Sequence, residues 1–141
     1  KDGAKLVNAV SNSTVPKISL VTRGSYGAGN YAMSGRSFNS NFLFTWPSAK
    51  IAVMGSEQAA KTLTSIKTAK MSNLSEEKKE EIFNEIKASY DKQSDARYAA
   101  ARMWTDEIIF PDETRNKISY ALSIISNIKS INKPNYGVLQ V

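Results

Sequence analysis

The sequence of 141 residues contains neither cysteine nor histidine. Without cysteine, the chain can form no disulfide and offers no thiolate nucleophile. Without histidine, it lacks the commonest general base and the commonest metal ligand, so we expect no metal site. These two absences sharply narrow the chemistry that the side chains of this protein can perform.

Long apolar runs and basic clusters are also missing. No apolar run approaches about 18 residues, so we expect no transmembrane helix, and no secretory signal is visible at the start. Basic residues do not interleave with aromatic ones, which disfavours binding to nucleic acid. The chain is 41% hydrophobic and begins with Lys1. We therefore expect one compact domain or part of a larger one, present here as a fragment or a processed product.

Carboxylates are absent between Asp2 and Glu57, although lysine and arginine recur throughout that span. The net charge of the whole chain is +6, and the part from Glu57 onward is near balance. A positive segment without carboxylates favours an anionic ligand or transition state. The alternative is a chance block of charge on a solvated surface.

Hydrophobic periodicity divides the chain into alternating strands and helices. A strand–glycine–helix unit occurs twice, at 17–34 and at 51–66. This repetition predicts an α/β fold with a mostly parallel sheet covered by helices. We expect strands at 17–22, 42–46 and 51–54, helices at 2–10, 28–34, 94–103, from 57, from 75 and after 111, and an extended end at 134–139.

Two of the expected helices have clear markers. Ser75 is a predicted N-cap, with Glu76 in the first turn, where the helix dipole favours a carboxylate. In the last helix, an apolar stripe repeats with helical spacing. That stripe consists of Ile118, Ala121, Leu122, Ile125 and Ile128.

The most informative segment is 23–33, Arg-Gly-Ser-Tyr-Gly-Ala-Gly-Asn-Tyr-Ala-Met. It lies between a predicted strand and a predicted helix. Glycine is used where a chain turns tightly or where a ligand approaches the backbone closely. A strand, a glycine turn and a helix start together aim free backbone N–H groups at one point, which suits an anion. Any site is therefore expected here, and a tight turn without a ligand is the alternative.

Elimination narrows the chemistry of this segment. Residues 27–32 fit the dinucleotide-binding pattern G-x-G-x-x-A, but that pattern needs an acidic residue about 20 positions later, and none precedes Glu57. A nucleotide-binding module stays open as an alternative. Ser25 has neither histidine nor a local carboxylate to activate it. The remaining possibility is that backbone N–H groups stabilise a developing oxyanion. Each such donor contributes about 3 kcal/mol to transition-state stabilisation.

Specific motifs then occur in one order along nearly the whole chain, with a poor match only at 66–95. The chain resembles the C-terminal part of the carboxyltransferase β subunit of biotin-dependent acyl-CoA carboxylases, of the methylcrotonoyl-CoA carboxylase type. The resemblance rests on Gly3-Ala4-Lys5, Val15-Pro16-Lys17-Ile18, Gly24-Ser25-Tyr26-Gly27-Ala28-Gly29-Asn30-Tyr31, Met33 with Gly35-Arg36, Phe42-Leu43 with Trp46-Pro47, Val53-Met54-Gly55 with Glu57-Gln58-Ala59-Ala60, Tyr98-Ala99-Ala100-Ala101-Arg102, Trp104-Thr105-Asp106, Ile108-Ile109, Pro111, Thr114-Arg115 and Tyr136-Gly137-Val138-Leu139.

The resemblance implies a crotonase-like (ClpP/crotonase) fold of repeated ββα units. It implies that residues 1–141 are the biotin-side C-terminal domain of the subunit, without the N-terminal acyl-CoA domain and inactive alone. The implied cofactor is biotin, carried as carboxybiotin on a partner α subunit, and the implied substrate is an acyl-CoA. The implied assembly is a β hexamer, with active sites between domains of different subunits.

The resemblance also implies a site. The backbone N–H groups of Ala28 and Gly29 would hold the ureido oxygen of biotin as charge develops. Tyr26, Gly27, Asn30 and Tyr31 would shape the biotin pocket, and packing around the turn is the alternative role for these side chains. The implied reaction is the carboxylation of methylcrotonoyl-CoA in leucine degradation, in the mitochondrial matrix or alternatively the bacterial cytoplasm. A propionyl-CoA or geranyl-CoA carboxylase β subunit is the alternative within the family.

Two departures from the family pattern leave a further alternative open. Phe110 precedes Pro111 where the family usually has aspartate, and Glu107 stands where glycine is usual. An aspartate there would cap the last helix, so its loss costs about 1 kcal/mol unless Asp112 compensates. These departures motivate a non-catalytic crotonase-fold assembly domain as the second hypothesis.

Overall fold

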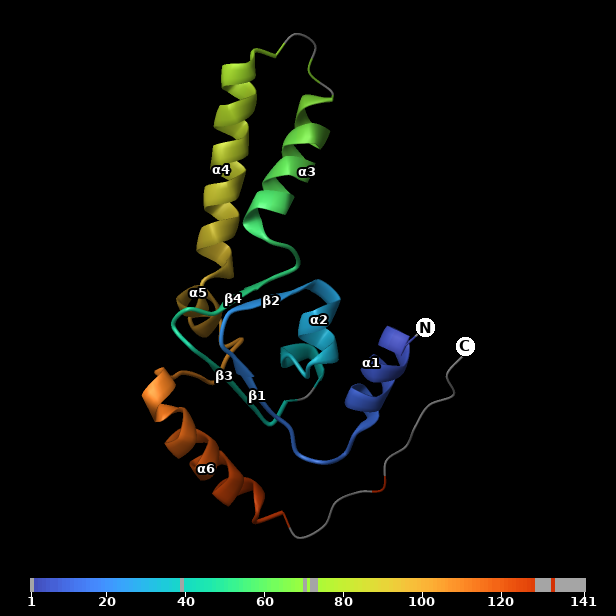
Figure 1. Ribbon diagram of the computed structural model, residues 1–141, viewed down its shortest axis with the longest axis vertical. Helices are drawn as coiled ribbons and strands as arrows, with labels where there is room; N and C mark the ends of the chain where they lie inside the picture. The colour runs from blue at the N-terminus through green and yellow to red at the C-terminus, as the bar shows by residue number, and fades with distance from the viewer. Residues whose placement is uncertain (1, 39, 70, 72–73, 129–132, 134–141) are drawn as a thin grey trace.

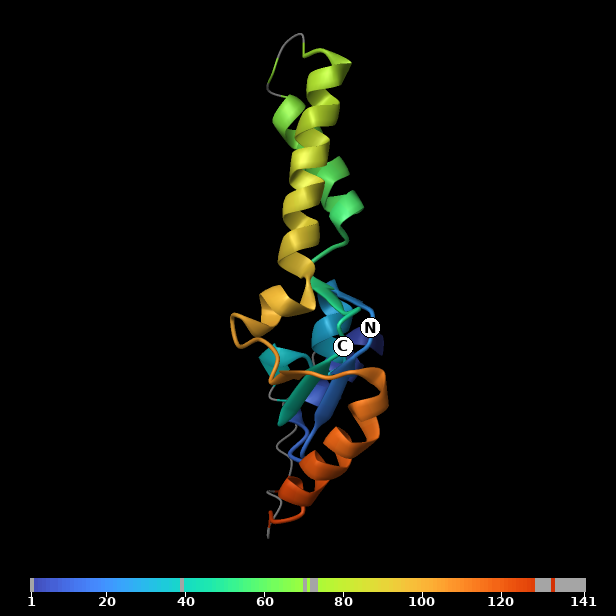
Figure 2. The ribbon, with the colours of Figure 1, turned by 90° about the vertical axis from the view of Figure 1, so that its left-hand side faces the viewer.

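The protein consists of a base, which contains all the strands, and an arm of two long helices that projects from it (Figures 1 and 2). This computed structural model describes residues 2–38, 40–69, 71, 74–128 and 133. The arm comprises the described residues among 56–94, and the base comprises the described residues on either side of it.

Two parallel sheets form the centre of the base. In the first, the strands β1 (Ile18–Val21), β3 (Phe42–Thr45) and β5 (Glu107–Ile108) lie in the order β1-β3-β5. In the second, β2 (Gly24–Tyr26) pairs with β4 (Lys50–Ala52). All three pairings are parallel, which confirms the predicted parallel arrangement. The short strands β2 and β5 were not predicted, because neither has the apolar alternation that marks a strand.

The base also carries α1 (Asp2–Asn12), α2 (Gly27–Ala32), α5 (Ala96–Ala100), α6 (Thr114–Ile125) and the 3₁₀ turns η1 (Arg36–Phe38) and η2 (Pro111–Glu113). The last helix, α6, covers the three-stranded sheet. There Phe44, Ile109 and Ala121 form a buried cluster, with partly buried apolar side chains packed around it. These packed side chains are Ile18, Leu20, Phe42 and Trp46.

The predicted apolar stripe of the last helix is only partly buried. Ala121 is 1% exposed, whereas Leu122 is 54% exposed and Ile128 is 47% exposed. Adjacent helical positions point about 100° apart, so residues 121 and 122 cannot both face a narrow sheet. Leu122 of the predicted stripe therefore lies outside the buried face, and Ile128 lies beyond the end of α6 at Ile125.

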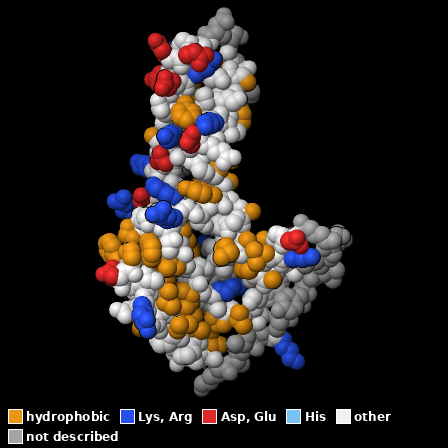
Figure 3. Space-filling view, viewed as in Figure 1, with side chains coloured by type: hydrophobic (Ala, Val, Ile, Leu, Met, Phe, Trp, Pro, Cys, Tyr) orange, Lys and Arg blue, Asp and Glu red, His pale blue; other side chains and the backbone are white. Residues whose placement is uncertain are grey.

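The arm is an antiparallel pair of helices, α3 (Ser56–Thr68) and α4 (Glu76–Ser94). Ser75 is confirmed as the N-cap of α4, since its Oγ accepts a hydrogen bond from the Lys78 N–H at 3.4 Å. Ala59 and Ala60 of α3 and Ile86 of α4 are buried. Charged side chains cover much of the arm, whereas hydrophobic side chains gather over the base (Figure 3).

The two departures from the family pattern are accommodated locally. Phe110 is 60% exposed and its side chain forms no cap hydrogen bond, but its N–H donates to Glu113 Oε2 at 2.8 Å, which supplies one of the two hydrogen bonds of a capping box. Glu107 forms an ion pair with Lys117. The predicted extended end at 134–139 lies outside the described residues. None of the helices in the described part of the chain is long and apolar enough to cross a bilayer.

Candidate functional site

The glycine segment forms the turn from β2 into α2. Tyr26 ends the strand and occupies the N-cap position with extended backbone angles. Gly27 follows with a φ of +55°, a left-handed conformation that side chains disfavour. A Cβ on Gly27 would also lie 3.1 Å from the carbonyl oxygen of Val53. Glycine is therefore required at position 27 by the backbone itself.

Ala28 and Gly29 form the first turn of α2, and both are exposed. The N–H groups in the first turn of a helix have no partner within the helix. A Cβ on Gly29 would meet no atom within 4 Å, so the space beside its backbone is open. Together with the facing side of α1, these residues line a groove of about 690 Å³. The α1 residues in this groove include the small side chains Gly3, Ala4 and Ser11.

Asn30 and Tyr31 directly follow Gly29 in α2. The Asn30 side chain is fixed, since its Nδ2 donates to Ser25 Oγ at 2.8 Å. The Tyr31 ring is 42% exposed and packs edge-on against Phe38, with ring centroids 5.8 Å apart. Asn30 thus has a structural contact of its own, and Tyr31 keeps a free face.

A second cavity, which we call the α2–β4 cavity, has a volume of about 390 Å³. It contains Gly27, Asn30 and Tyr31 from α2 and meets β3, β4 and the loop that precedes β5. The other walls are largely apolar. They are formed by Leu43, Ile51, Ala52, Val53 and Trp104, with Arg36 and Ser37 completing the lining.

Tyr26 lies apart from both spaces. It borders a depression at the start of α3 together with Glu57 and Lys61. The predicted site residues therefore line three separate spaces: the groove beside α1, the α2–β4 cavity and the depression at the start of α3. They do not share one pocket. The Lys61 ammonium, 2.7 Å from Glu57 Oε1, lowers the pKa of Glu57. That direction keeps the carboxylate ionised and unsuited to accept protons near neutral pH.

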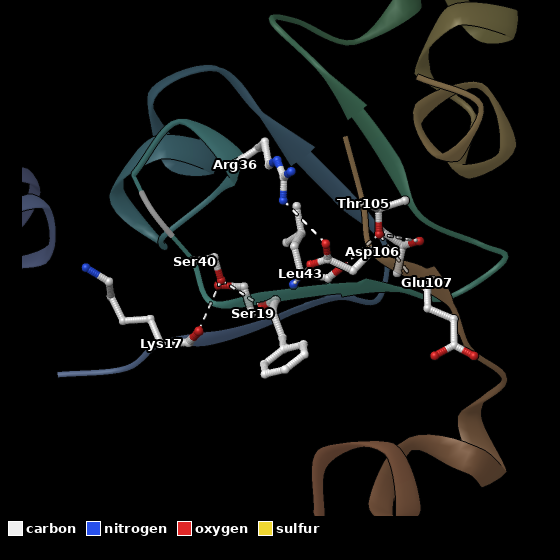
Figure 4. Close-up of polar contacts among 10 residues, drawn as sticks. Lys17, Ser19, Arg36, Ser40, Leu43, Thr105, Asp106 and Glu107 are labelled. Atoms are coloured by element: carbon white, nitrogen blue, oxygen red, sulfur yellow. Dashed lines mark hydrogen bonds and ion pairs between the residues drawn. The ribbon is translucent and has the colours of Figure 1, made fainter. Parts of the chain in front are cut away.

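Asp106 forms an ion pair with Arg36 and also accepts a hydrogen bond from the backbone of β3 (Figure 4). Arg36 Nη1 lies 3.4 Å from Asp106 Oδ1, and Asp106 Oδ2 accepts a hydrogen bond from the Leu43 N–H at 2.7 Å. Sequence reasoning missed Trp104 and Leu43 as lining residues. The sequence gives no signal that these two residues meet. They are brought together by hydrogen bonds between Leu43 and residues 62 and 63 positions later in the chain.

The arrangement can bind an anionic oxygen through the exposed backbone of the α2 N-terminus. Parallel strand pairs and connecting helices around such a turn define a crotonase-like α/β domain. Residues 1–137 match the family described as "Carboxyl transferase domain". The chain belongs to the carboxyl transferase family.

The chain is similar over its whole length to the biotin-dependent 3-methylcrotonyl-coenzyme A carboxylase β1 subunit of Mycobacterium tuberculosis, with 41% identity. It is 42% identical, over 97% of its length, to the mitochondrial methylcrotonoyl-CoA carboxylase β chain of Dictyostelium discoideum. The crystal structure of the geranyl-CoA carboxylase β subunit of P. aeruginosa superposes on 99% of the chain, with a TM-score of 0.82 and 38% identity. The chain spans about a quarter of the length of these proteins, from 24% to 27%.

Proposed function

We propose that this chain is the biotin-side, C-terminal part of the carboxyltransferase subunit of a biotin-dependent acyl-CoA carboxylase. The observation that carries the proposal is the pair of exposed backbone positions, Ala28 and Gly29, at the start of α2 in a chain without histidine or cysteine. The family and the relatives named for this activity support it. The acyl-CoA domain then lies elsewhere in the subunit.

The groove between α1 and α2 fits biotin as a ligand. Gly27 is constrained by the fold, whereas nothing in the described chain fills the space beside Gly29. Glycine at position 29 therefore leaves the neighbouring N–H groups uncovered. The small α1 side chains leave room for a slender group beside them.

In this mechanism the chain supplies electrostatics rather than a proton-transfer side chain. The N–H groups of Ala28 and Gly29 would hold the ureido oxygen of biotin, and each hydrogen bond would contribute about 3 kcal/mol to transition-state stabilisation. The helix start adds a favourable dipole. Asn30, fixed by Ser25, holds the following turn in place. When bound, carboxybiotin supplies both the CO₂ and the base.

For the substrate, we propose methylcrotonoyl-CoA, which places the protein in leucine degradation. Relatives named for this substrate are 41% and 42% identical to the chain, and the named propionyl-CoA carboxylase of Cereibacter sphaeroides is 36% identical. We further propose a biotin-carrying α subunit as partner and a β hexamer as assembly, as named for the 12S transcarboxylase structure. The proposed compartment is the mitochondrial matrix in a eukaryote or the cytoplasm in a bacterium.

The decisive experiment is Gly29→Ala in the full-length subunit with its biotin-carrying partner. The new Cβ meets no protein atom within 4 Å, so stability should stay equal or rise by about 0.5 to 1 kcal/mol. We expect kcat for carboxyl transfer to fall about 100-fold or more, because the Cβ covers the N–H groups. Gly55→Ala, which also fills open space but lies outside the groove, is the matched control and should keep full activity.

Ala28→Pro gives an independent check, because proline removes one N–H and is tolerated in the first turn of a helix. Undiminished turnover in folded Gly29→Ala and Ala28→Pro proteins would contradict the backbone site. The domain proposal has its own test. The isolated 141-residue chain should not turn over free carboxybiotin and acyl-CoA, and robust turnover would overturn the assignment to one half of a site.

A further inference from the structure

The groove that the proposed function assigns to biotin has two walls. One wall is the first turn of α2, and the other is the facing side of α1, which lies beside α2 (Figure 1). The two helices are attached to the rest of the base in different ways. The proposed function uses the backbone of the α2 wall, whereas the width of the groove also depends on what holds α1 in place.

The α2 wall is fixed at both ends of the helix. At its start, β2 leads directly into the helix through Gly27, and β2 is itself paired with β4. At its end, Ser19 Oγ of β1 donates to the Ser34 carbonyl oxygen at 2.8 Å. The two sheets therefore set the position of α2, and with it the position of the backbone N–H groups in its first turn.

The α1 wall has much less support from packing. The helix contacts α2, but none of its residues is buried. The last four carbonyl groups of a helix have no partner within the helix. The last turn of α1 also contains no basic residue that could complement the helix dipole. The end of α1 therefore needs a donor, preferably a cation, from outside the helix.

Lys17, the residue before β1, provides that cation. Its Nζ donates to the Val10 carbonyl oxygen in the last turn of α1 at 2.9 Å, and to the Ser13 carbonyl oxygen just beyond the helix at 3.1 Å. The backbone of Lys17 is itself fixed. Its N–H donates to Asn41 Oδ1 at 2.8 Å, and its carbonyl oxygen accepts a hydrogen bond from the Asn41 N–H at 2.8 Å. Lys17 thus connects the end of α1 to the sheet.

Strand alternation places this connection on the same side of the sheet as the groove. Ile18 and Leu20 pack against the buried cluster beneath α6. Successive strand residues point to opposite faces, so Lys17 and Ser19 point away from that cluster and reach α1 and α2. Figure 4 shows them beside Ser40, whose Oγ lies 3.2 Å from Ser19 Oγ and 3.3 Å from the Lys17 carbonyl oxygen. One face of this segment therefore holds both walls of the groove.

We propose that Lys17 is a positioning residue for biotin, because its ammonium group holds α1 in place and thereby sets the width of the groove. Lys17 does not line the groove and acts through α1. This inference rests on the proposed carboxyltransferase function and adds to it a residue outside the glycine segment. Loss of the ammonium group should loosen α1 while α2 and its N–H donors stay in place. Biotin binding should therefore weaken, and the reaction of bound biotin should stay nearly unchanged.

The experiment measures KM for free carboxybiotin and for the acyl-CoA separately in the full-length subunit. Lys17→Met should raise KM for carboxybiotin about tenfold, as expected for a lost hydrogen bond from a charged group, and should leave kcat and KM for the acyl-CoA within about twofold. Lys17→Gln, which keeps a donor without the charge, should show a smaller rise, and Lys17→Arg should restore most of the binding. Lys5→Met, which removes an exposed ammonium group of α1 that pairs with Asp2, is the matched control and should behave like the wild type.

Two measurements without turnover complete the test. In Lys17→Met, the Kd for free biotin from titration calorimetry should rise with KM, and hydrogen exchange should become faster for amides of α1 but not of β1 and β3. A lower kcat with both KM values unchanged would indicate a merely structural role, and it would overturn the inference, as would an unchanged Kd. The proposed function stands in both cases if the wild type carboxylates an acyl-CoA. A wild type that carboxylates no acyl-CoA would overturn the proposed function and this inference together.

Discussion

In the base, strands far apart in the sequence lie side by side, whereas in the arm two helices joined by a short link pair mainly with each other. Phe44 of β3 is opposite Glu107 of β5, although 63 residues separate them along the chain. The base therefore depends on distant contacts, and each of its turns is constrained by several elements at once. The arm depends on local helix formation and one shared apolar seam.

This difference explains where the family signature lies. The motifs that identify the family are concentrated in the base, where the chain must turn around the site. The poorly matching stretch, 66–95, lies almost wholly in the arm. A helix pair accepts many sequences as long as it keeps an apolar seam and its caps. The following predictions test this contrast, from the largest expected effect to the smallest.

Gly35→Ala should break the base. A Cβ at this position would lie 2.2 Å from Asn30 Oδ1 and 2.6 Å from the Asn30 carbonyl oxygen, which accepts the Gly35 N–H hydrogen bond. The backbone must shift to relieve this overlap, so we expect a loss of about 3 kcal/mol in unfolding free energy. Urea denaturation measures it, with Gly3→Ala as the control. Equal stability of the two variants would refute the constraint at Gly35.

Ser34→Gly should strengthen the base. Ser34 has a φ of +57°, and its buried Oγ has no hydrogen-bond partner among the described residues. Glycine relieves both penalties but loses more backbone entropy, so we expect a net gain of about 1 kcal/mol. Met103→Gly, which relieves only the backbone strain, should gain less. A loss of stability in Ser34→Gly, measured by thermal unfolding, would show that the hydroxyl has a favourable role.

Ser75→Ala should weaken the arm without affecting the base. The substitution removes the N-cap of α4, which typically costs about 1 kcal/mol. Hydrogen exchange should become faster for amides in the first turns of α4 and stay unchanged for amides in β1 and β3. Ser65→Ala, at an exposed position within α3, is the matched control and should slow or preserve exchange. Faster exchange across the sheet would mean that arm and base unfold as one unit.

Asp95 joins the arm to the base, and its titration should give the smallest effect. The Arg97 side chain, by hydrogen bonding, lowers the pKa of Asp95, against an opposing effect of burial, and the Arg97 N–H and Lys50 add to the lowering. A lowered pKa means that this stabilisation is present above about pH 4 and is lost as the pH falls through the folded-state value.

The variant Asp95→Asn keeps an N-cap side chain for α5 but cannot ionise. Its melting temperature should therefore fall less steeply with acidification than that of the wild type. The difference between the two curves isolates Asp95 from the other carboxylates. Parallel curves between about pH 5 and pH 2 would show that the charge contributes nothing at this junction.

Much of this fold could be predicted from the sequence. Apolar alternation and glycine spacing located β1, β3 and β4 and the starts of α2 and α3, and repetition of the βα unit indicated parallel pairing. The elements that were missed share a cause. β2 and β5 are two or three residues long and exist because a partner strand is already in place. β4 is as short as β2, but the apolar run 51–54 marks it, whereas β2 and β5 have no apolar run of that length.

For the candidate site, too, some features could be predicted from the sequence and others could not. The sequence alone determined that the chain lacks imidazole and thiol groups and that a glycine turn leads into a helix, because composition and local backbone preferences are properties of neighbouring residues. The tertiary structure decided which side of that helix each residue faces. It placed Ala28 and Gly29 on the groove beside α1 and brought Trp104 and Val53 to the cavity on the other side. Contacts across 60 or more residues set these surroundings, and no local pattern encodes them.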